Sequence, residues 1–135
     1  MKYKVINEND CQYIVDSNVL ISYAGNRSNI IIPDCIEIIG RNAFKGNLDI
    51  RSLDLNKVVE IGEDAFSGCK NLKHIILSNS LSLIEQCAFS NIDNTAIVIY
   101  RGTVEDYNKI LKGEPFTKVI CDNGIYSQTN FDILM

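Results

Sequence analysis

The side chains in this sequence that could do chemistry are few. His74 is the only histidine. If the strand-like stretches of the chain pair as β-strands, Ser52 and Asp54 lie near it. A hydroxyl, an imidazole and a carboxylate are the groups of a nucleophilic hydrolase, so these three residues define one candidate catalytic site. Polar trios of this kind also arise by chance on neighbouring strands, and an exposed histidine is the simpler interpretation. We therefore expect no enzyme, and a hydrolase using Ser52, His74 and Asp54 is the alternative from another class.

The sequence gives even less support for a metal-binding site or a cofactor-binding site. The five cysteines are dispersed along the chain: Cys11, Cys35, Cys69, Cys87 and Cys121. Their number is odd, no C-x-x-C spacing occurs, and a single histidine does not complete a tetrahedral zinc site. The sequence also lacks glycine-rich phosphate loops and calcium-binding Asp/Asn ladders. It therefore predicts free, mostly buried thiols, no metal and no cofactor.

The charge balance and the hydropathy pattern exclude two classes of partner. The 135 residues carry 17 Asp and Glu against 13 Lys and Arg, a net charge of −4. Nucleic-acid binding needs a surplus of basic side chains, so we expect no nucleic-acid partner. No apolar run approaches the roughly 20 residues that span a membrane, and the first residues lack the apolar stretch of a signal peptide. We therefore expect a cytoplasmic protein with no membrane insertion.

One segment occurs three times, and its spacing indicates which elements carry these side chains. Each copy ends in an Ala-Phe pair, and Phe44, Phe66 and Phe89 are 22 and then 23 residues apart. Short strand-like stretches lie between the copies in the same frame and end at residues 32, 55, 77 and 100. A fixed period of about 20 to 29 residues with one strand per period predicts a leucine-rich solenoid of parallel strands.

Alternation within each strand-like stretch assigns one face to the core and the other to solvent. The Ala-Phe pairs are expected to fill the interior beneath the return turns. The inward residues are expected to stack into apolar columns: Ile30/Ile32, Leu53/Leu55, Ile75/Leu77 and Val98/Tyr100. The outward residues are expected to form two further columns: Asn29/Ser52/His74/Ile97 and Ile31/Asp54/Ile76/Ile99.

The second residue of each copy, directly after its isoleucine, is a further position of interest. Gly40 and Gly62 occupy this position in the first two copies, where we expect an unusual backbone conformation or a close approach that a Cβ would obstruct. The third copy has Glu85 instead, which predicts a distorted third turn.

The two ends of the array are expected to be caps. Residues 12–23 alternate apolar and polar across a Ser17-Asn18 turn, which predicts a hairpin over the first repeat. At the other end Thr103 is a candidate N-cap for one helix near 104–111, ended by Gly113 and followed by a strand near 117–121. The residues expected on the buried face of this helix are Val104, Tyr107, Ile110 and Leu111.

The repeats and both caps resemble the BspA-type leucine-rich repeat. The resemblance rests on residues 32–44 and 65–72 in the array, on 13–26 in the hairpin, and on 100–110 and 119–124 in the final cap. It covers about residues 12–126 and departs at Asn56 and Ser78, where the family usually has proline. It implies a β-rich, right-handed leucine-rich-repeat superhelix with about three repeats, an N-terminal β-hairpin cap and a helix-containing C-terminal cap.

The expected domain organisation is a single leucine-rich repeat domain over residues 1–135. It comprises an N-terminal cap over 1–28, repeats over 29–95 and a C-terminal cap over 96–135. The apolar tail at 131–135 lies beyond the family pattern, and we expect it to pack on the cap or to contact a partner.

An outward face rich in isoleucine is the remaining functional feature. Exposed apolar strips often mark contact sites, and the resemblance implies the same role, because BspA-type repeats are interaction surfaces on bacterial and protozoan cells. We therefore expect a module that binds a protein partner. Two alternatives stay open: a small intracellular inhibitor or adaptor of phage or mobile-element type that acts on a host protein, and a homo-oligomer formed through the strip or the tail. The candidate partner-binding residues are Ile31, Asp54, His74, Ile76, Ile97 and Ile99.

Overall fold

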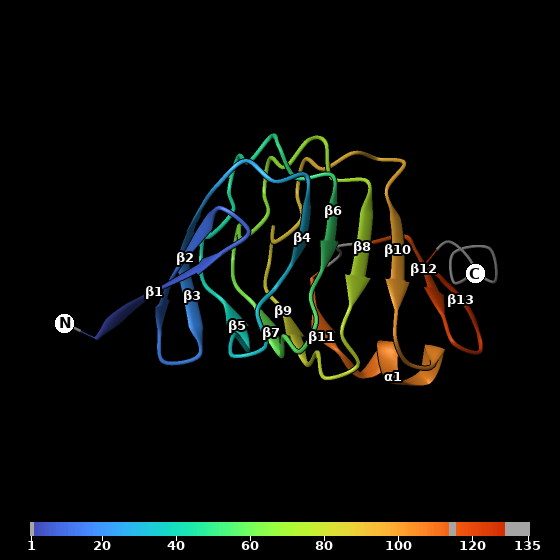
Figure 1. Cartoon of the computed structure of the whole chain (residues 1–135). Helices are drawn as coiled ribbons and strands as arrows, with labels where there is room; N and C mark the ends of the chain where they lie inside the picture. The colour runs from blue at the N-terminus through green and yellow to red at the C-terminus, as the bar shows by residue number, and fades with distance from the viewer. Residues whose placement is uncertain (1, 114–115, 129–135) are drawn as a thin grey trace.

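The chain winds into a β-solenoid of about four turns in a computed structural model that describes residues 2–113 and 116–128 (Figure 1). Two sheets run along the solenoid and enclose the core between them. The six-stranded sheet has the order β13-β12-β10-β8-β6-β4, and its strands are β4 (Asn29–Ile31), β6 (Ser52–Asp54), β8 (His74–Leu77), β10 (Ile97–Tyr100), β12 (Lys118–Cys121) and β13 (Gly124–Ser127). The seven-stranded sheet has the order β1-β2-β3-β5-β7-β9-β11, and its strands are β1 (Tyr3–Glu8), β2 (Cys11–Asp16), β3 (Val19–Ala24), β5 (Ile38–Ile39), β7 (Glu60–Ile61), β9 (Leu83–Ile84) and β11 (Leu111–Lys112).

The inward face of the six-stranded sheet is the one that alternation predicts. Strands β4, β6, β8 and β10 pair in parallel, which aligns Ile30, Leu53, Ile75 and Val98 in one row. All eight predicted inward residues are buried. The assignment of the two faces is therefore confirmed, since a slip of one residue would have reversed it.

The phenylalanines of the three copies form a continuous column of rings beneath the return turns. Phe44 stacks on Phe66 with 4.9 Å between ring centroids, and Phe66 stacks on Phe89 at 5.1 Å. The caps extend this column, with Tyr23 at 4.8 Å from Phe44 and Phe116 at 5.1 Å from Phe89. The predicted burial of the Ala-Phe pairs is confirmed, and the column joins both caps to the repeats.

Phe116 extends the column and β11 extends the seven-stranded sheet, although both lie outside the three copies that the repeat pattern reveals. Parallel pairing of β11 with β9 brings Leu111 beside Leu83, so that Gly113 follows β11 as Glu85 follows β9. The prediction that Gly113 ends the helix is therefore wrong. Leu111, predicted on the buried helix face, is 70% exposed because it lies in β11.

Glycine occupies positions 40 and 62 because other backbone segments approach them closely, and not because either residue has an unusual φ. A Cβ on Gly40 would collide with the carbonyl oxygen of Leu20, and one on Gly62 would lie 2.9 Å from the carbonyl oxygen of Ile39. The turn that begins at Glu85 keeps the backbone bond to the preceding turn and two internal bonds of its predecessors, donated by the Ala88 and Ser90 N–H groups. The bond from the Ala88 N–H to the Glu85 carbonyl is 3.4 Å long, against 3.2 Å for its counterparts in the two earlier copies.

The N-terminal cap contains the predicted hairpin and one further strand. β2 and β3 pair antiparallel across the Ser17-Asn18 turn. β3 then pairs in parallel with β5, which joins the hairpin to the array. β1 adds a third antiparallel strand beside β2, and the sequence analysis did not predict it.

The C-terminal cap contains a helix, α1 (Val104–Lys109), and the predicted final strand, β12. The hydroxyl of Thr103 accepts a hydrogen bond from the Asp106 N–H at 3.1 Å, as expected for an N-cap. Tyr107 is fully buried beneath the helix. Within the described residues, no helix is long and apolar enough to cross a membrane. The divisions at residues 28/29 and 95/96 stay predictions, and the tail at 131–135 lies outside the described residues.

Candidate functional site

The outward columns of the six-stranded sheet lie where the sequence places them. Parallel register brings Ile31, Asp54, Ile76 and Ile99 into one row and Asn29, Ser52, His74 and Ile97 into the next. Ile31 is 65% exposed, Ile97 46% and Ile99 40%, whereas Ile76 is half-buried between its neighbours. The six residues predicted to bind a partner therefore share one face of one sheet.

The apolar row continues into the C-terminal cap. Ile99 pairs with Ile120 on β12, and Ile120 pairs with Ile125 on β13. Both added side chains are exposed. Sequence reasoning missed them because it treated this segment as a cap, although its alternation has the phase of the earlier strands. We name this surface the isoleucine strip and define it as Ile31, Ile76, Ile97, Ile99, Ile120 and Ile125.

One ion pair crosses the face near the ends of the strands. Arg101 follows β10, and its guanidinium lies 3.4 Å from a carboxylate oxygen of Asp54 on β6, two strands away. The other Asp54 carboxylate oxygen accepts a hydrogen bond from the Asn56 N–H at 2.8 Å. The Asp54 carboxylate thus places a charged group in the row between Ile31 and Ile76. The contribution of the ion pair to stability is small because both groups contact water.

The candidate catalytic residues are neighbours, but their polar atoms are engaged elsewhere. Ser52 and His74 pair across adjacent strands. The Ser52 hydroxyl donates to the Asn29 side chain at 2.7 Å, and Asp54 is held by Arg101 and Asn56. The carboxylate therefore does not orient the imidazole, which a catalytic triad requires.

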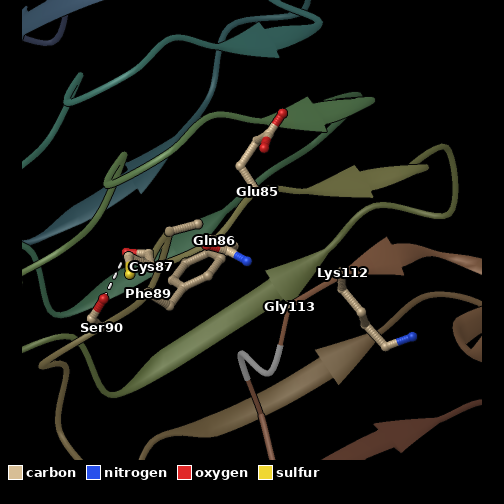
Figure 2. A pocket seen from close by; sticks show the side chains of 8 residues that line it. Glu85, Gln86, Cys87, Phe89, Ser90, Lys112 and Gly113 are labelled. Atoms are coloured by element: carbon tan, nitrogen blue, oxygen red, sulfur yellow. Dashed lines mark hydrogen bonds between the residues drawn. The ribbon is translucent and has the colours of Figure 1, made fainter.

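Two hollows occur near the C-terminal end of the array. One is a cavity of about 680 Å³ beside the third return turn, where the Ser90 hydroxyl donates to the Cys87 carbonyl at 2.8 Å (Figure 2). The Glu85 and Lys112 side chains diverge at its rim, so it contains no paired acid and base. The second, of about 520 Å³, adjoins the isoleucine strip at Ile97 and Ile120. In the described part of the chain, no cluster of three or more His, Cys, Asp or Glu could hold a metal ion.

The five cysteines are free thiols, as predicted. Cys11, Cys69 and Cys121 are buried, whereas Cys35 and Cys87 are exposed. Burial raises the pKa of the Cys69 thiol to about 11, and it also raises that of Cys121. The thiolate is the reactive form, so Cys69 and Cys121 are protected from alkylating and disulfide reagents both by burial and by their raised pKa.

We expect a thiol-reactive chromophore to label two cysteines rapidly in the native protein and all five after denaturation. The rapid pair should be Cys35 and Cys87, because only these are exposed. Quenched-time-point mass spectrometry of proteolytic fragments measures which thiols react. Matched variants Cys35→Ser and Cys87→Ser should each remove one rapid equivalent. Fewer than five thiols in freshly prepared, denatured protein would contradict the absence of disulfides.

Comparison with known proteins adds the following findings. A family model described as the BspA-type leucine-rich repeat region matches residues 17–125 in six copies. The solved structure of a leucine-rich repeat protein from T. pallidum is 22% identical with a TM-score of 0.54, over 74% of this chain and 51% of that one. A leucine-rich cell surface protein from Faecalibacterium prausnitzii A2-165 is 20% identical with a TM-score of 0.43, over 82% of this chain and 42% of that one. The chain thus spans about half the length of these structures or less, and no curated protein matches it.

Proposed function

This chain belongs to the BspA-type leucine-rich repeat family, and from this premise we propose that it is a non-enzymatic module that binds a protein partner through its six-stranded sheet. Leucine-rich repeat proteins generally mediate protein–protein interaction. The observation that carries the proposal is the isoleucine strip. The contact surface consists of Ile31, Asp54, His74, Ile76, Ile97 and Ile99, extended by Ile120 and Ile125.

The composition of this face supports the proposal. Contiguous exposed apolar surface is uncommon on folded proteins and often marks a contact site. Protein interfaces commonly have an apolar centre with a polar rim. Here five of the six isoleucines occupy the neighbouring strands β8, β10, β12 and β13, and Asp54 on β6 separates Ile31 from them. His74 and the Asp54–Arg101 pair supply polar groups beside them.

The rigidity of the face also supports the proposal. Ile76 and Ile99 project from strands that are paired on both sides, and β-branched side chains have few accessible rotamers. Little conformational freedom is therefore lost when a partner covers them. Such preorganisation leaves more of the contact energy for affinity.

The test is a pair of charge substitutions in the strip with a matched control outside it. Ile76→Asp and Ile99→Asp should abolish capture of the partner from a native cell lysate, because each places a carboxylate at the centre of the contact. Leu111→Asp makes the same kind of change at an exposed apolar residue of the other sheet and should leave capture intact. The captured partner is then titrated with each purified variant.

A partner that binds both strip variants as tightly as the unchanged protein would contradict this function. Equal loss with Leu111→Asp would place the contact elsewhere and contradict it as well. Far-ultraviolet dichroism of all three variants establishes that the fold is retained before binding is compared.

A further inference from the structure

β1 is the outer edge of the seven-stranded sheet, and one side of its backbone faces away from β2. Its pairing with β2 runs from Tyr3↔Asp16 to Glu8↔Cys11. The connecting residues Asn9 and Asp10 have φ of 53° and 63°, the signature of a two-residue type I′ turn. Glu8 and Cys11 flank this turn, so they form a hydrogen-bonded pair of the antiparallel ladder.

The alternation of such pairs fixes where every backbone group of β1 points. The N–H and C=O groups of Lys4, Ile6 and Glu8 face β2, and those of Tyr3, Val5 and Asn7 face away from the sheet. Ile6 is half-buried, and the other five side chains of β1 are exposed. In Figure 1 β1 lies at the N-terminal end of the solenoid, beyond the two-sheet body. An edge of this kind can pair with another strand.

The side chains on one face of this edge have a self-complementary charge pattern. Within β1, alternate positions read Lys4, Ile6 and Glu8, so that a positive charge precedes the central isoleucine and a negative charge follows it. A second copy of the same strand, running antiparallel, presents these charges in the opposite order. Centred on Ile6, the two copies place Lys4 of each opposite Glu8 of the other, which makes two ion pairs around an Ile6–Ile6 contact.

Only this register pairs the two charged residues of this face of β1 with each other. A shift of two residues in either direction sets Lys4 or Glu8 opposite Ile6, and a parallel in-register arrangement sets lysine against lysine. A shift of one residue sets the backbone groups of Val5 and Asn7 out of phase with those of the second copy. In the centred register Val5 lies opposite Asn7 of the second copy, and the N–H and C=O groups of both face away from β2 and have no strand partner within the described residues, as a new hydrogen-bonded pair requires.

We propose that β1 pairs antiparallel with β1 of a second copy of this chain, joining the two seven-stranded sheets edge to edge around a two-fold axis at Ile6. The contact is isologous, as in most closed dimers. It extends the partly buried environment of Ile6 and leaves the isoleucine strip free, because the strip lies on the other sheet. The dimer therefore carries two copies of the proposed contact face, pointing away from a shared centre.

Sedimentation equilibrium of the full chain is the primary measurement. A concentration-dependent dimer is expected, and it should weaken as salt is raised from 50 mM towards about 500 mM because exposed ion pairs are screened. Val5→Pro removes an N–H from the free edge without removing a β1–β2 hydrogen bond, and it should abolish the dimer. Ile99→Asp, which changes the strip alone, should leave the dimer unchanged.

Charge reversal supplies a test that does not depend on proline. Lys4→Glu and Glu8→Lys each turn two attractive pairs into repulsive ones, so each should raise the dimer dissociation constant about tenfold or more. Mixed in equal amounts, the two variants should form a heterodimer, because the acidic side chain introduced at position 4 then meets the basic one introduced at position 8. Melting curves check that each variant folds.

A chain that stays monomeric at low salt up to millimolar concentration overturns the proposal. So does a dimer that survives both Val5→Pro and the single charge reversals, or one that is lost with Ile99→Asp. Failure of the mixed variants to pair also overturns it. None of these outcomes bears on partner capture by the strip, which is measured separately.

Discussion

Leu53→Asp and Ile75→Asp are expected to unfold the protein, whereas Ile76→Asp and Ile99→Asp should leave its melting temperature nearly unchanged. Leu53 and Ile75 are at most 1% exposed and lie in the inward row of the six-stranded sheet. Losing a buried aliphatic side chain costs about 2 to 5 kcal/mol, and an unpaired buried carboxylate costs several kcal/mol more. This sum approaches the whole stability of a typical domain, about 5 to 15 kcal/mol.

The outward pair differs because its side chains contact water in the folded state. Substitutions at such positions usually change stability by no more than about 0.5 kcal/mol. Thermal melts followed by circular dichroism compare the four variants directly. A similar collapse in all four would mean that the outward residues contribute to the core, and the proposed contact face would then lose its physical basis.

Phe66→Ala is expected to lower the free energy of unfolding by about 3 to 5 kcal/mol, the range for a large aromatic removed from a core. The Phe66 ring is fully buried between the rings of Phe44 and Phe89, and its neighbours are held by backbone hydrogen bonds between turns. They cannot easily collapse into the space left behind. The cavity therefore persists, and its cost adds to the lost burial.

Phe116→Ala is the matched control for this prediction. Phe116 is 8% exposed and contacts one ring of the column, that of Phe89, among the described residues. Its loss should therefore lower stability by distinctly less. Urea denaturation of the two variants gives both midpoints and slopes. Equal shifts in the two denaturation midpoints would show that the stability contributed by a ring of the column does not depend on the position of that ring along the array.

Much of the architecture follows from the period and the phase of the sequence. A spacing of 22 or 23 residues fixes which residues stack, and alternation fixes which face is buried, so Leu53 and Ile75 are assigned correctly without any structure. β1 was not predicted because five of its six side chains are exposed and its sequence lacks an amphipathic pattern. Phe116 was not predicted as a member of the ring column because its spacing from Gly113 is one residue shorter than that from Gly40 to Phe44, and no alanine precedes it in the sequence.

The candidate site is predictable to a similar extent. Four of its isoleucines, Ile31, Ile76, Ile97 and Ile99, are found from the strand phase alone, because neighbouring turns repeat it, whereas Ile120 and Ile125 were missed because their segment was treated as a cap. The Asp54–Arg101 pair joins residues 47 positions apart and two strands away, and it depends on how side chains lie across the sheet. The repeat pattern of the sequence does not indicate such a side-chain contact. The role of the strip in binding stays a prediction until a partner is titrated.

The column of rings also has a consequence for the size of the molecule. Each turn contributes one ring and one strand of each sheet, so every added turn lengthens the body by the same amount. One inserted copy of 23 residues would extend the solenoid by about 4.8 Å, the spacing of neighbouring strands. The length of the array is thus proportional to the number of copies. Duplication of a copy within the gene can lengthen the array in equal steps without a change in either cap.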